Sequence, residues 1–273
     1  MTPPRAAPRH TREHDDLLAL FDREQRQDVT YPGFRRGVLT DLVRMTPIKP
    51  PYDEGAIIYS RLQEATADAS IAAQIAYFET LGYGFEWKTY GHDTPDDLPD
   101  RLLRLGFEAE EPESVMVMDL VEAPELVELS PVEGVRLLTN PEDIREVVSV
   151  LARVWGEEDA WLGPVLASEM AETPDLLRIY VAYVNGVPAS TAWIRYHPDS
   201  SFASLWGGST VPDHRGRGLY RALLSARARD AHGRGVRYLT VDASPMSRPI
   251  LERLGFRLLT VTRPFKWTSR PRS

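Results

Sequence analysis

The chain has 273 residues, a formal net charge of −8 at pH 7 and no cysteine. The lack of cysteine excludes disulfides, a thiol nucleophile and cysteine-bound zinc, and the six scattered histidines lack metal-ligand spacing, so we expect no metal. The sequence is acidic and contains neither a long apolar run nor a signal-peptide core. We therefore expect a cytoplasmic protein that binds neither nucleic acid nor membrane. The length predicts two domains.

The first half of the sequence predicts a mixture of helices and strands. Its segments, in chain order, are a flexible tail (residues 1–14), a helix (57–81, with a break near Ala69 and Ser70), a strand (85–90), a helix start (93–96), a helix ending in Gly106 and Phe107, and a strand (114–118). Residues 121–132 contain two prolines and several glutamates, which predict a linker.

The second half has clearer boundaries. Its predicted elements are a strand (135–138), a helix capped by Asn140, a helix (162–172), two strands (179–184 and 187–196), a strand (202–211), a helix (219–234), a strand (238–241) and a short helix from Pro245 to Gly255. Asn185 and Gly186 separate two of these strands, and this dipeptide is the strongest short signal for a hairpin. We expect a mixed sheet with helices on both faces.

The connection between the strand at 202–211 and the following helix is basic and rich in glycine. Gly216 and Gly218 let the backbone approach an anion closely, and the first free amides of the helix point toward it. Arg215 and Arg217 add charge-assisted hydrogen bonds to phosphate oxygens. The loop lacks both the Lys-Ser/Thr of ATP-type loops and the three glycines of dinucleotide folds. It therefore predicts another phosphate-containing ligand.

Two motifs resemble those of the GNAT N-acetyltransferase superfamily. The family's pyrophosphate loop reads Arg or Gln, two residues, Gly, one residue, then Gly or Ala; Arg215 and Gly218 match, whereas Tyr220 replaces the small third residue. The second motif is a short helix ending in Leu-Gly-Phe, found here at 254–256. The resemblance covers about residues 133–267.

The resemblance implies acetyl-CoA as the acyl donor and direct attack on its thioester by an amine. The residues it implies for cofactor binding are Ser209, Thr210, Val211, Arg215, Gly216, Arg217, Gly218, Leu219, Tyr220 and Ser244. Backbone amides near 209–211 are expected to polarise the thioester carbonyl. Gly207 and Gly208 in the preceding strand predict either a bulge with close backbone approach or a simple bend.

The sequence does not single out the general base that would accept the proton of the amine or the general acid that would protonate the thiolate. Leu251 stands where the family often has the tyrosine that protonates the leaving thiolate, and the strand at 202–211 has no carboxylate. The candidate bases are Glu157, Glu158 and Asp242; the first two lie in an acidic loop with Asp159. The acidic loop is alternatively a solvated, helix-capping turn, and Asp242 is alternatively a cap for the following turn. An ordered water that carries the proton is a further alternative, so no catalytic residue is assigned.

A partial echo of the second half occurs in the first. Leu105-Gly106-Phe107 repeats Leu254-Gly255-Phe256 in a similar order of elements, which indicates a degenerate copy of the same fold, with coincidence as the alternative. The acidic, proline-rich segment at 50–55 stands in place of a phosphate loop, so one cofactor site is expected. Four residues are predicted either to line a groove between the halves or to serve the core and local turns: Trp87, Tyr90, His92 and Asp93.

We therefore predict an α/β protein with a mixed sheet, organised as a tail (1–14), a degenerate GNAT-like domain (15–122), a linker (123–132), a GNAT acetyltransferase domain (133–268) and a second tail (269–273). The predicted partner is a small-molecule amine, which the acidic charge weakly favours through steering. The alternatives are a non-catalytic acyl-CoA sensor and an acetyltransferase acting on protein N-termini or lysines. A homodimer is left open. Only three of the 32 basic residues are lysine, a usage typical of GC-rich bacteria.

Overall fold

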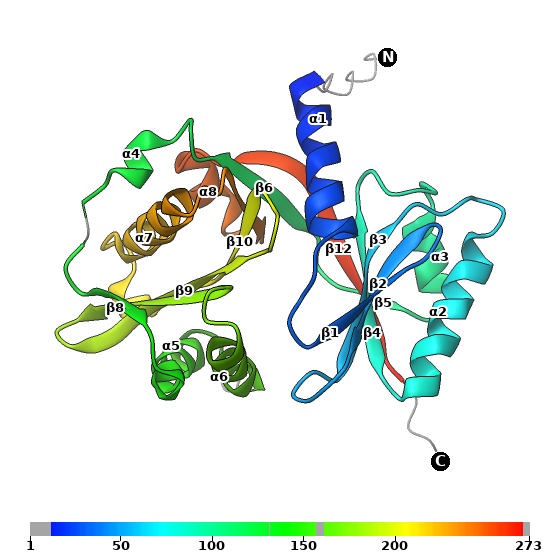
Figure 1. Cartoon of the computed structure of the whole chain (residues 1–273), viewed down its shortest axis with the longest axis horizontal. Coiled ribbons are helices and arrows are strands. Elements are labelled where there is room, and N and C mark those ends of the chain that lie inside the picture. Colours follow the sequence, from blue (N-terminus) through cyan, green and yellow to red (C-terminus); the bar gives the residue numbers. More distant parts are fainter. Residues whose placement is uncertain (1–11, 131, 157–160, 270–273) are drawn as a thin grey trace, which may run out of the picture.

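The computed structural model describes residues 12–130, 132–156 and 161–269. Within these ranges, the strands form one mixed sheet in the order β1-β2-β3-β4-β12-β6-β11-β10-β9-β8-β7, with β5 also paired to β12 (Figure 1). The strands are β1 (Phe34–Val38), β2 (Leu42–Pro47), β3 (Glu54–Ser60), β4 (Gly84–Tyr90), β5 (Glu108–Ala109), β6 (Glu113–Asp119), β7 (Val135–Leu138), β8 (Leu177–Val184), β9 (Val187–Tyr196), β10 (Phe202–Thr210), β11 (Tyr238–Ala243) and β12 (Arg257–Trp267). The predicted α/β class with a mixed sheet is confirmed.

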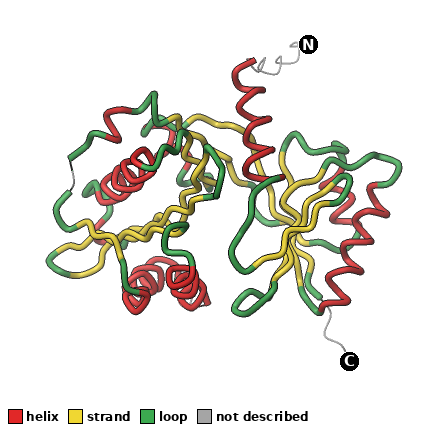
Figure 2. Tube along the Cα trace, in the orientation of Figure 1, coloured by secondary structure: helices red, strands yellow, loops and turns green. Residues whose placement is uncertain are grey.

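Helices cover both faces of the second half of the sheet (Figure 2). The helical segments are α1 (Arg12–Phe21), η1 (Asp22–Gln27), α2 (Ala67–Leu81), α3 (Leu98–Arg104), α4 (Pro124–Val127), η2 (Pro141–Asp143), α5 (Ile144–Trp155), α6 (Leu162–Glu172), η4 (Pro212–His214), α7 (Leu219–Gly233) and α8 (Arg248–Arg253). In Figure 1, α5 and α6 lie on one face, and α7 and α8 lie on the other. Helices α2 and α3 pack on the first half, and α1 stands between the halves.

The two halves of the sequence share the centre of the sheet. Strand β6, from the first half, pairs with β11, so that Asp119 lies opposite Tyr238. Strand β12, the last in the chain, lies between β6 and β4 and pairs antiparallel with both. The segment 123–132, predicted as a linker, separates the two halves of the sequence, but strands from both halves pair within one sheet. Part of that segment forms α4, whose Leu126 is buried and packs with α7.

Local sequence signals are confirmed where they are strongest. Asn185 and Gly186 have φ angles of 52° and 78°, the left-handed values that a two-residue hairpin turn between β8 and β9 requires. Asn140 caps η2, since its side-chain oxygen accepts a hydrogen bond from the amide of Glu142. The helix predicted at 162–172 is α6.

Other predictions for the elements were wrong. Residues 57–60 belong to β3 and not to a helix, because Ile57 and Ser60 face a buried side of the sheet, and the helix begins only at Ala67. Helix α1 begins at Arg12, inside the segment predicted as a tail, and strands β1 and β2 were not predicted. Two helices begin three or more residues later than expected: α3 at Leu98 and α8 at Arg248.

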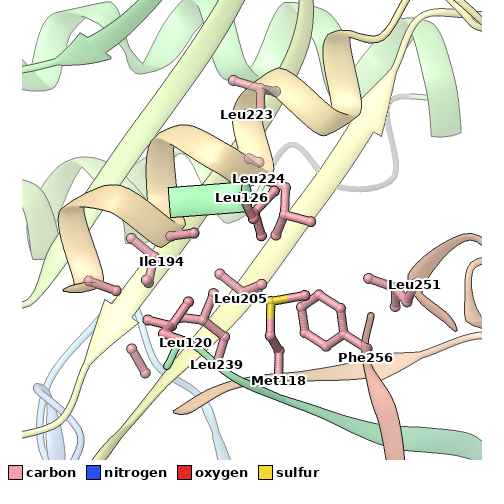
Figure 3. Close-up of a cluster of buried hydrophobic side chains, with 14 of the residues drawn as sticks. Met118, Leu120, Leu126, Ile194, Leu205, Leu223, Leu224, Leu239, Leu251 and Phe256 are labelled. Carbon is pink, nitrogen blue, oxygen red and sulfur yellow. The ribbon is translucent and has the colours of Figure 1, made fainter. Parts of the chain in front are cut away.

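The largest apolar core joins α7 to the strands beneath it (Figure 3). Leu223 and Leu224 of α7 pack on Leu205 of β10 and Leu239 of β11, and Met118 of β6 belongs to the same cluster. Fully burying an aliphatic side chain of this size stabilises the fold by about 1.5–3 kcal/mol. The first half of the sequence therefore helps to fix the helix that follows the glycine-rich loop.

Segment α1–η1 ties the halves together on the opposite face. The ring of Phe21 packs edge-on against Phe202 of β10, with centroids 5.9 Å apart. The carboxylate of Glu24 accepts a hydrogen bond of 2.7 Å from the amide of Ser201. The guanidinium of Arg26 pairs with Asp93 at 2.7 Å and lies 3.8 Å from the ring centroid of Tyr90. These contacts position η1 over β4 and β10.

We predict that β12 stabilises both halves. Phe265 is fully buried on this strand, and its replacement by alanine is expected to lower the free energy of unfolding by about 3–5 kcal/mol, because a large cavity is left. Val261→Ala, at a 43% exposed position of the same strand, is the matched control and is expected to change little. Urea unfolding followed by circular dichroism measures both. Equal effects of the two substitutions would contradict the assignment.

Candidate active site

The neighbouring strands β10 and β11 separate soon after they meet. They pair in parallel only from Phe202 opposite Tyr238 to Ser204 opposite Thr240. Beyond this point β10 pairs with β9 alone, and its register shifts between Trp206 and Ser209. Gly207 has a φ of 61° at this shift, so the predicted bulge is confirmed. The edge of β10 that faces β11 is thereby left open.

A cavity of about 300 Å³ lies at this opening. The side chains of a strand alternate between faces, and Leu205 and Val241 point toward α7, whereas Trp206 and Asp242 point toward the opposite face. Residues of both orientations line the cavity, so it passes through the plane of the sheet. Its walls come from η1, β3, β4 and β6 of the first half and from β10, α7, β11 and α8 of the second.

The glycine-rich loop lies at the start of α7 and is exposed. Gly216 and Gly218 have φ angles of 72° and 79°, and a Cβ on either would meet nothing within 4 Å. The amides of residues 216–218 donate to no group in the described part of the chain, and the first-turn amides of a helix have no partner within it. The loop thus presents a row of free amides at a helix N-terminus, as an anion site requires.

Each of the two arginines of the loop makes one polar contact within the protein. Nε of Arg215 donates to the carbonyl of Thr210 at 3.1 Å and so braces the loop against the end of β10. Nη1 of Arg217 lies 3.2 Å from Nδ1 of His214. Both side chains are exposed, and their remaining guanidinium nitrogens lie at the loop surface.

Two of the residues predicted to bind the cofactor at the end of β10 form hydrogen bonds with other parts of the protein. Oγ of Ser209 accepts a hydrogen bond from Nε1 of Trp155, and the amide of Val211 donates to Ala189 at 2.9 Å. The Val211 amide is therefore not available to polarise a thioester carbonyl, which corrects one expectation. Because amides alternate in direction along a strand, the amide of Thr210 faces the open edge.

The second motif contributes Ser247 and Leu251 to the cavity wall. Ser244, predicted to bind the cofactor, caps a turn: its Oγ accepts from the amide of Ser247 at 3.3 Å. Leu251 is buried, so no proton donor occupies its position. The ring of Tyr220 lies against Gly208 and lines the cavity, and burial raises the pKa of its hydroxyl, which therefore stays protonated at neutral pH.

An ionic cluster lies on the opposite face. Nζ of Lys88 in β4 pairs with Asp242 of β11 at 2.5 Å. Burial opposes the charge of Lys88, but nearby carboxylates, led by that of Asp242, hold its pKa well above the ordinary value. Glu113 of β6 also lines the cavity. Its pKa is raised by burial and further by Asp242, against the opposing effect of Lys88.

Several residues that line this cavity were not predicted from the sequence. Lys88, Glu113 and Arg227 were not singled out, although Lys88 alternates with buried residues along β4. Tyr90 lines the cavity, but Trp87 is fully buried and donates to Ser60, as expected of the core.

The remaining predicted residues divide into three groups. The carboxylate of Asp93 accepts hydrogen bonds from Arg26, and Nε2 of His92 lies 3.0 Å from Asp22, so these two residues make polar contacts with η1. Asp242 lies in the cavity. Glu157 and Glu158 fall outside the described residues.

Within the described ranges, no group of three or more His, Asp or Glu side chains could hold a metal ion. No helix there has both the length and the apolar character needed to cross a membrane.

Comparison with known proteins identifies the second half. Residues 142–256 match the model of the acetyltransferase (GNAT) family. A GCN5-related N-acetyltransferase from Kribbella flavida is 14% identical and covers 96% of this chain and 95% of its own, with a TM-score of 0.65. A functionally unknown conserved protein from Staphylococcus epidermidis is 12% identical and covers 88% of this chain and 96% of its own, with a TM-score of 0.64. A tandem GNAT protein from the clavulanic acid biosynthesis pathway is 15% identical and covers 100% of this chain and 92% of its own, with a TM-score of 0.58. No curated protein matches the sequence.

Residues 142–256 are therefore a GNAT acetyltransferase domain, and the resemblance inferred from the two motifs is confirmed. At these low identities the structural matches show the fold alone, and they extend over both halves of the chain. The first half thus shares the GNAT-like fold, as the repeated Leu-Gly-Phe indicated.

We predict that the bulge depends on glycine at 207. A Cβ there would lie 1.7 Å from the ring of Trp193, so Gly207→Ala is expected to cost about 1–3 kcal/mol for overpacking, in addition to about 1–2 kcal/mol for the left-handed backbone. Gly186→Ala is the matched control, because Gly186 has a similar φ and an open surrounding. Thermal unfolding compares the two variants, and equal losses would show that the contact with Trp193 imposes no constraint.

Proposed function

We propose that the protein transfers an acetyl group from acetyl-CoA to the amine of a small molecule by direct attack in the gap between β10 and β11. The observation that carries this proposal is a single cavity that passes through the sheet. On one side lie α7 and its exposed anion loop, and on the other lie carboxylates from both halves. A donor and an acceptor that enter from opposite faces would meet at the opening.

The donor is expected to bind along α7. The free amides of residues 216–220 would hold the diphosphate, and Arg217 would add charge. The thioester arm would then follow the open edge of β10, where the amide of Thr210 would polarise the carbonyl. Holding the two reactants in this geometry supplies at most about 7–11 kcal/mol of the acceleration.

Glu113 is our candidate for the general base. An attacking amine has to lose a proton, and a carboxylate whose pKa is raised toward neutrality accepts protons more effectively than an ordinary one. Glu113 lines the cavity on the acceptor face, beside the Lys88–Asp242 pair. The charge of Asp242 is balanced by its ion pair with Lys88, so Asp242 is better suited to positioning the acceptor amine than to accepting a proton from it.

The leaving thiolate has two hydroxyls within the cavity on its own face. Leu251 cannot donate a proton, but Tyr220 and Ser247 line the same wall. Tyr220 is protonated at neutral pH because burial raises its pKa, so it is our candidate for the general acid. A thiolate is also a fair leaving group without help, since a free thiol has a pKa of about 8.5.

The acceptor face favours a small molecule over a protein. Phe21 and Gln25 of the α1–η1 segment, with Tyr31, line the cavity from above. This segment covers part of the acceptor side, which favours a small molecule over a peptide lying in an open groove. The alternative of a sensor without catalysis draws its support from Leu251.

We predict that Gly218→Glu abolishes binding of acetyl-CoA, because it introduces a carboxylate among the amides that would hold the diphosphate. Gly235→Glu is the matched control: Gly235 follows α7, has a φ of 78° and is equally open, so the backbone strain is similar. Isothermal titration calorimetry with each full-length variant measures the affinity. Retained binding by Gly218→Glu would refute the location of the donor site.

We predict that Glu113→Gln lowers kcat by roughly 10²–10⁴-fold, as expected for loss of a general base. In the wild type the rate rises with pH as Glu113 loses its proton, and the raised pKa places this rise above the range of an ordinary glutamate, whose pKa is about 4.3. The rise is expected to vanish in the variant. Release of coenzyme A thiol, followed across pH with a panel of amines, measures it.

Glu111→Gln provides the control, because Glu111 is exposed two residues earlier. An unchanged pH profile in Glu113→Gln would place the base elsewhere. Tight binding of acetyl-CoA without thiol release for any amine would favour the sensor, and release with peptides alone would favour a protein acetyltransferase.

A further inference from the structure

Arg227 is a buried cation on the wall of the cavity. It lies on α7 and is only 1% exposed. Its Nε donates to the carbonyl of Leu223 at 3.1 Å, and its Nη1 donates to the carbonyl of Trp193 at 3.2 Å. In the described part of the chain its Nη2 makes no hydrogen bond. Two neutral carbonyls therefore fix the guanidinium but leave its charge and one of its nitrogens unsatisfied.

The lack of a carboxylate partner sets Arg227 apart. The other fully buried arginine of the described residues, Arg26, pairs with both Asp22 and Asp93. Lys88, across the cavity, pairs with Asp242. No ion pair to Arg227 forms among the described residues, and the groups that act on its charge are tyrosines. Burial lowers its pKa to about 10, so it remains a cation at neutral pH. Burying such a charge is costly unless an anion accompanies it.

Arg227 lies on the donor side of the cavity. Tyr220, seven residues earlier on α7, lines the same wall, since two helical turns bring residues back to one face. At 1.5 Å per residue, Arg227 lies about 13 Å along α7 from Gly218. The acceptor-side carboxylates Glu113 and Asp242 belong to strands on the other side of the opening. The unpaired charge thus faces the end of the donor site that is remote from the diphosphate.

We propose that the donor site accepts a short acyl group ending in a carboxylate, such as malonyl, whose carboxylate pairs with Arg227. This inference rests on the proposed function, because it takes coenzyme A to be held by the loop at the start of α7. In the transfer, the amine nitrogen forms a bond to the thioester carbon, the carbon–sulfur bond breaks and the thiolate takes up a proton. The distal carboxylate is unchanged and passes to the product.

If Arg227 pairs with the carboxylate of the acyl group, the donor site should distinguish two acyl groups of the same shape by their charge. Malonyl and isovaleryl groups have the same branched outline, but only malonyl carries a carboxylate. A charge-assisted hydrogen bond to a buried guanidinium favours malonyl, whereas isovaleryl would cover the guanidinium and leave it without an anion. We expect the wild-type chain to bind malonyl-CoA at least about tenfold more tightly than isovaleryl-CoA, and to release thiol from malonyl-CoA with an accepted amine.

Calorimetry on the full-length chain with malonyl-CoA, isovaleryl-CoA and acetyl-CoA tests this. Arg227→Met is expected to abolish the preference for malonyl-CoA, and Arg227→Lys to retain part of it. Arg229→Met is the matched control: Arg229 lies on the same helix but donates to carbonyls of the 127–129 segment, outside the cavity. It is expected to keep the full preference.

The outcomes separate this inference from the proposed function. Failure of every coenzyme A thioester to bind the wild type would refute the proposed function. Binding of isovaleryl-CoA as tightly as malonyl-CoA, or an equal preference in Arg227→Met and wild type, would overturn the inference alone. The wild-type comparison needs no variant, so it decides the matter even if Arg227→Met fails to fold.

Discussion

The site depends on how briefly β10 and β11 pair. After three residue pairs the strands diverge, and β10 then bulges at Gly207 while it stays paired with β9. A continuous ladder would close the sheet, and hydrogen-bonded backbone would then separate the two faces that now share one cavity. The same divergence opens the edge of β10 near Thr210. It also brings side chains from both faces of the sheet into one cavity.

The first half of the chain keeps the fold but not the phosphate loop. What it contributes instead is one wall of the cavity: Lys88 on β4 and Glu113 on β6 face the opening, and η1 covers it. The segment between β2 and β3 also contacts the second half of the chain, away from the cavity, since the hydroxyl of Tyr52 donates to Glu169 of α6 at 2.7 Å. In the proposed reaction, the second copy of the fold would hold the donor and the first would line the acceptor side.

The sequence predicts features that are encoded locally. The hairpin at Asn185 and the cap at Asn140 each depend on a few adjacent residues, and both were predicted correctly. The pairing of Lys88 with Asp242 joins residues 154 positions apart, and the insertion of β6 beside β11 has no local signal. Ile57 was assigned to the same helix as residues 67–81, although its neighbours in space are strands. Arg227 resembles the surface arginines of a polar helix until the cavity is seen.

The shared centre of the sheet has a consequence for synthesis on the ribosome. Strand β4 leaves the ribosome early, but β12, which pairs with it, is made long afterwards. Until then β4 presents an unsatisfied edge that could template pairing with another nascent chain. Strand β6 waits in the same way for both β11 and β12. Pairing between the two halves is therefore completed only after β12 has been made, and molecules truncated before residue 257 lack the strand that joins the two halves.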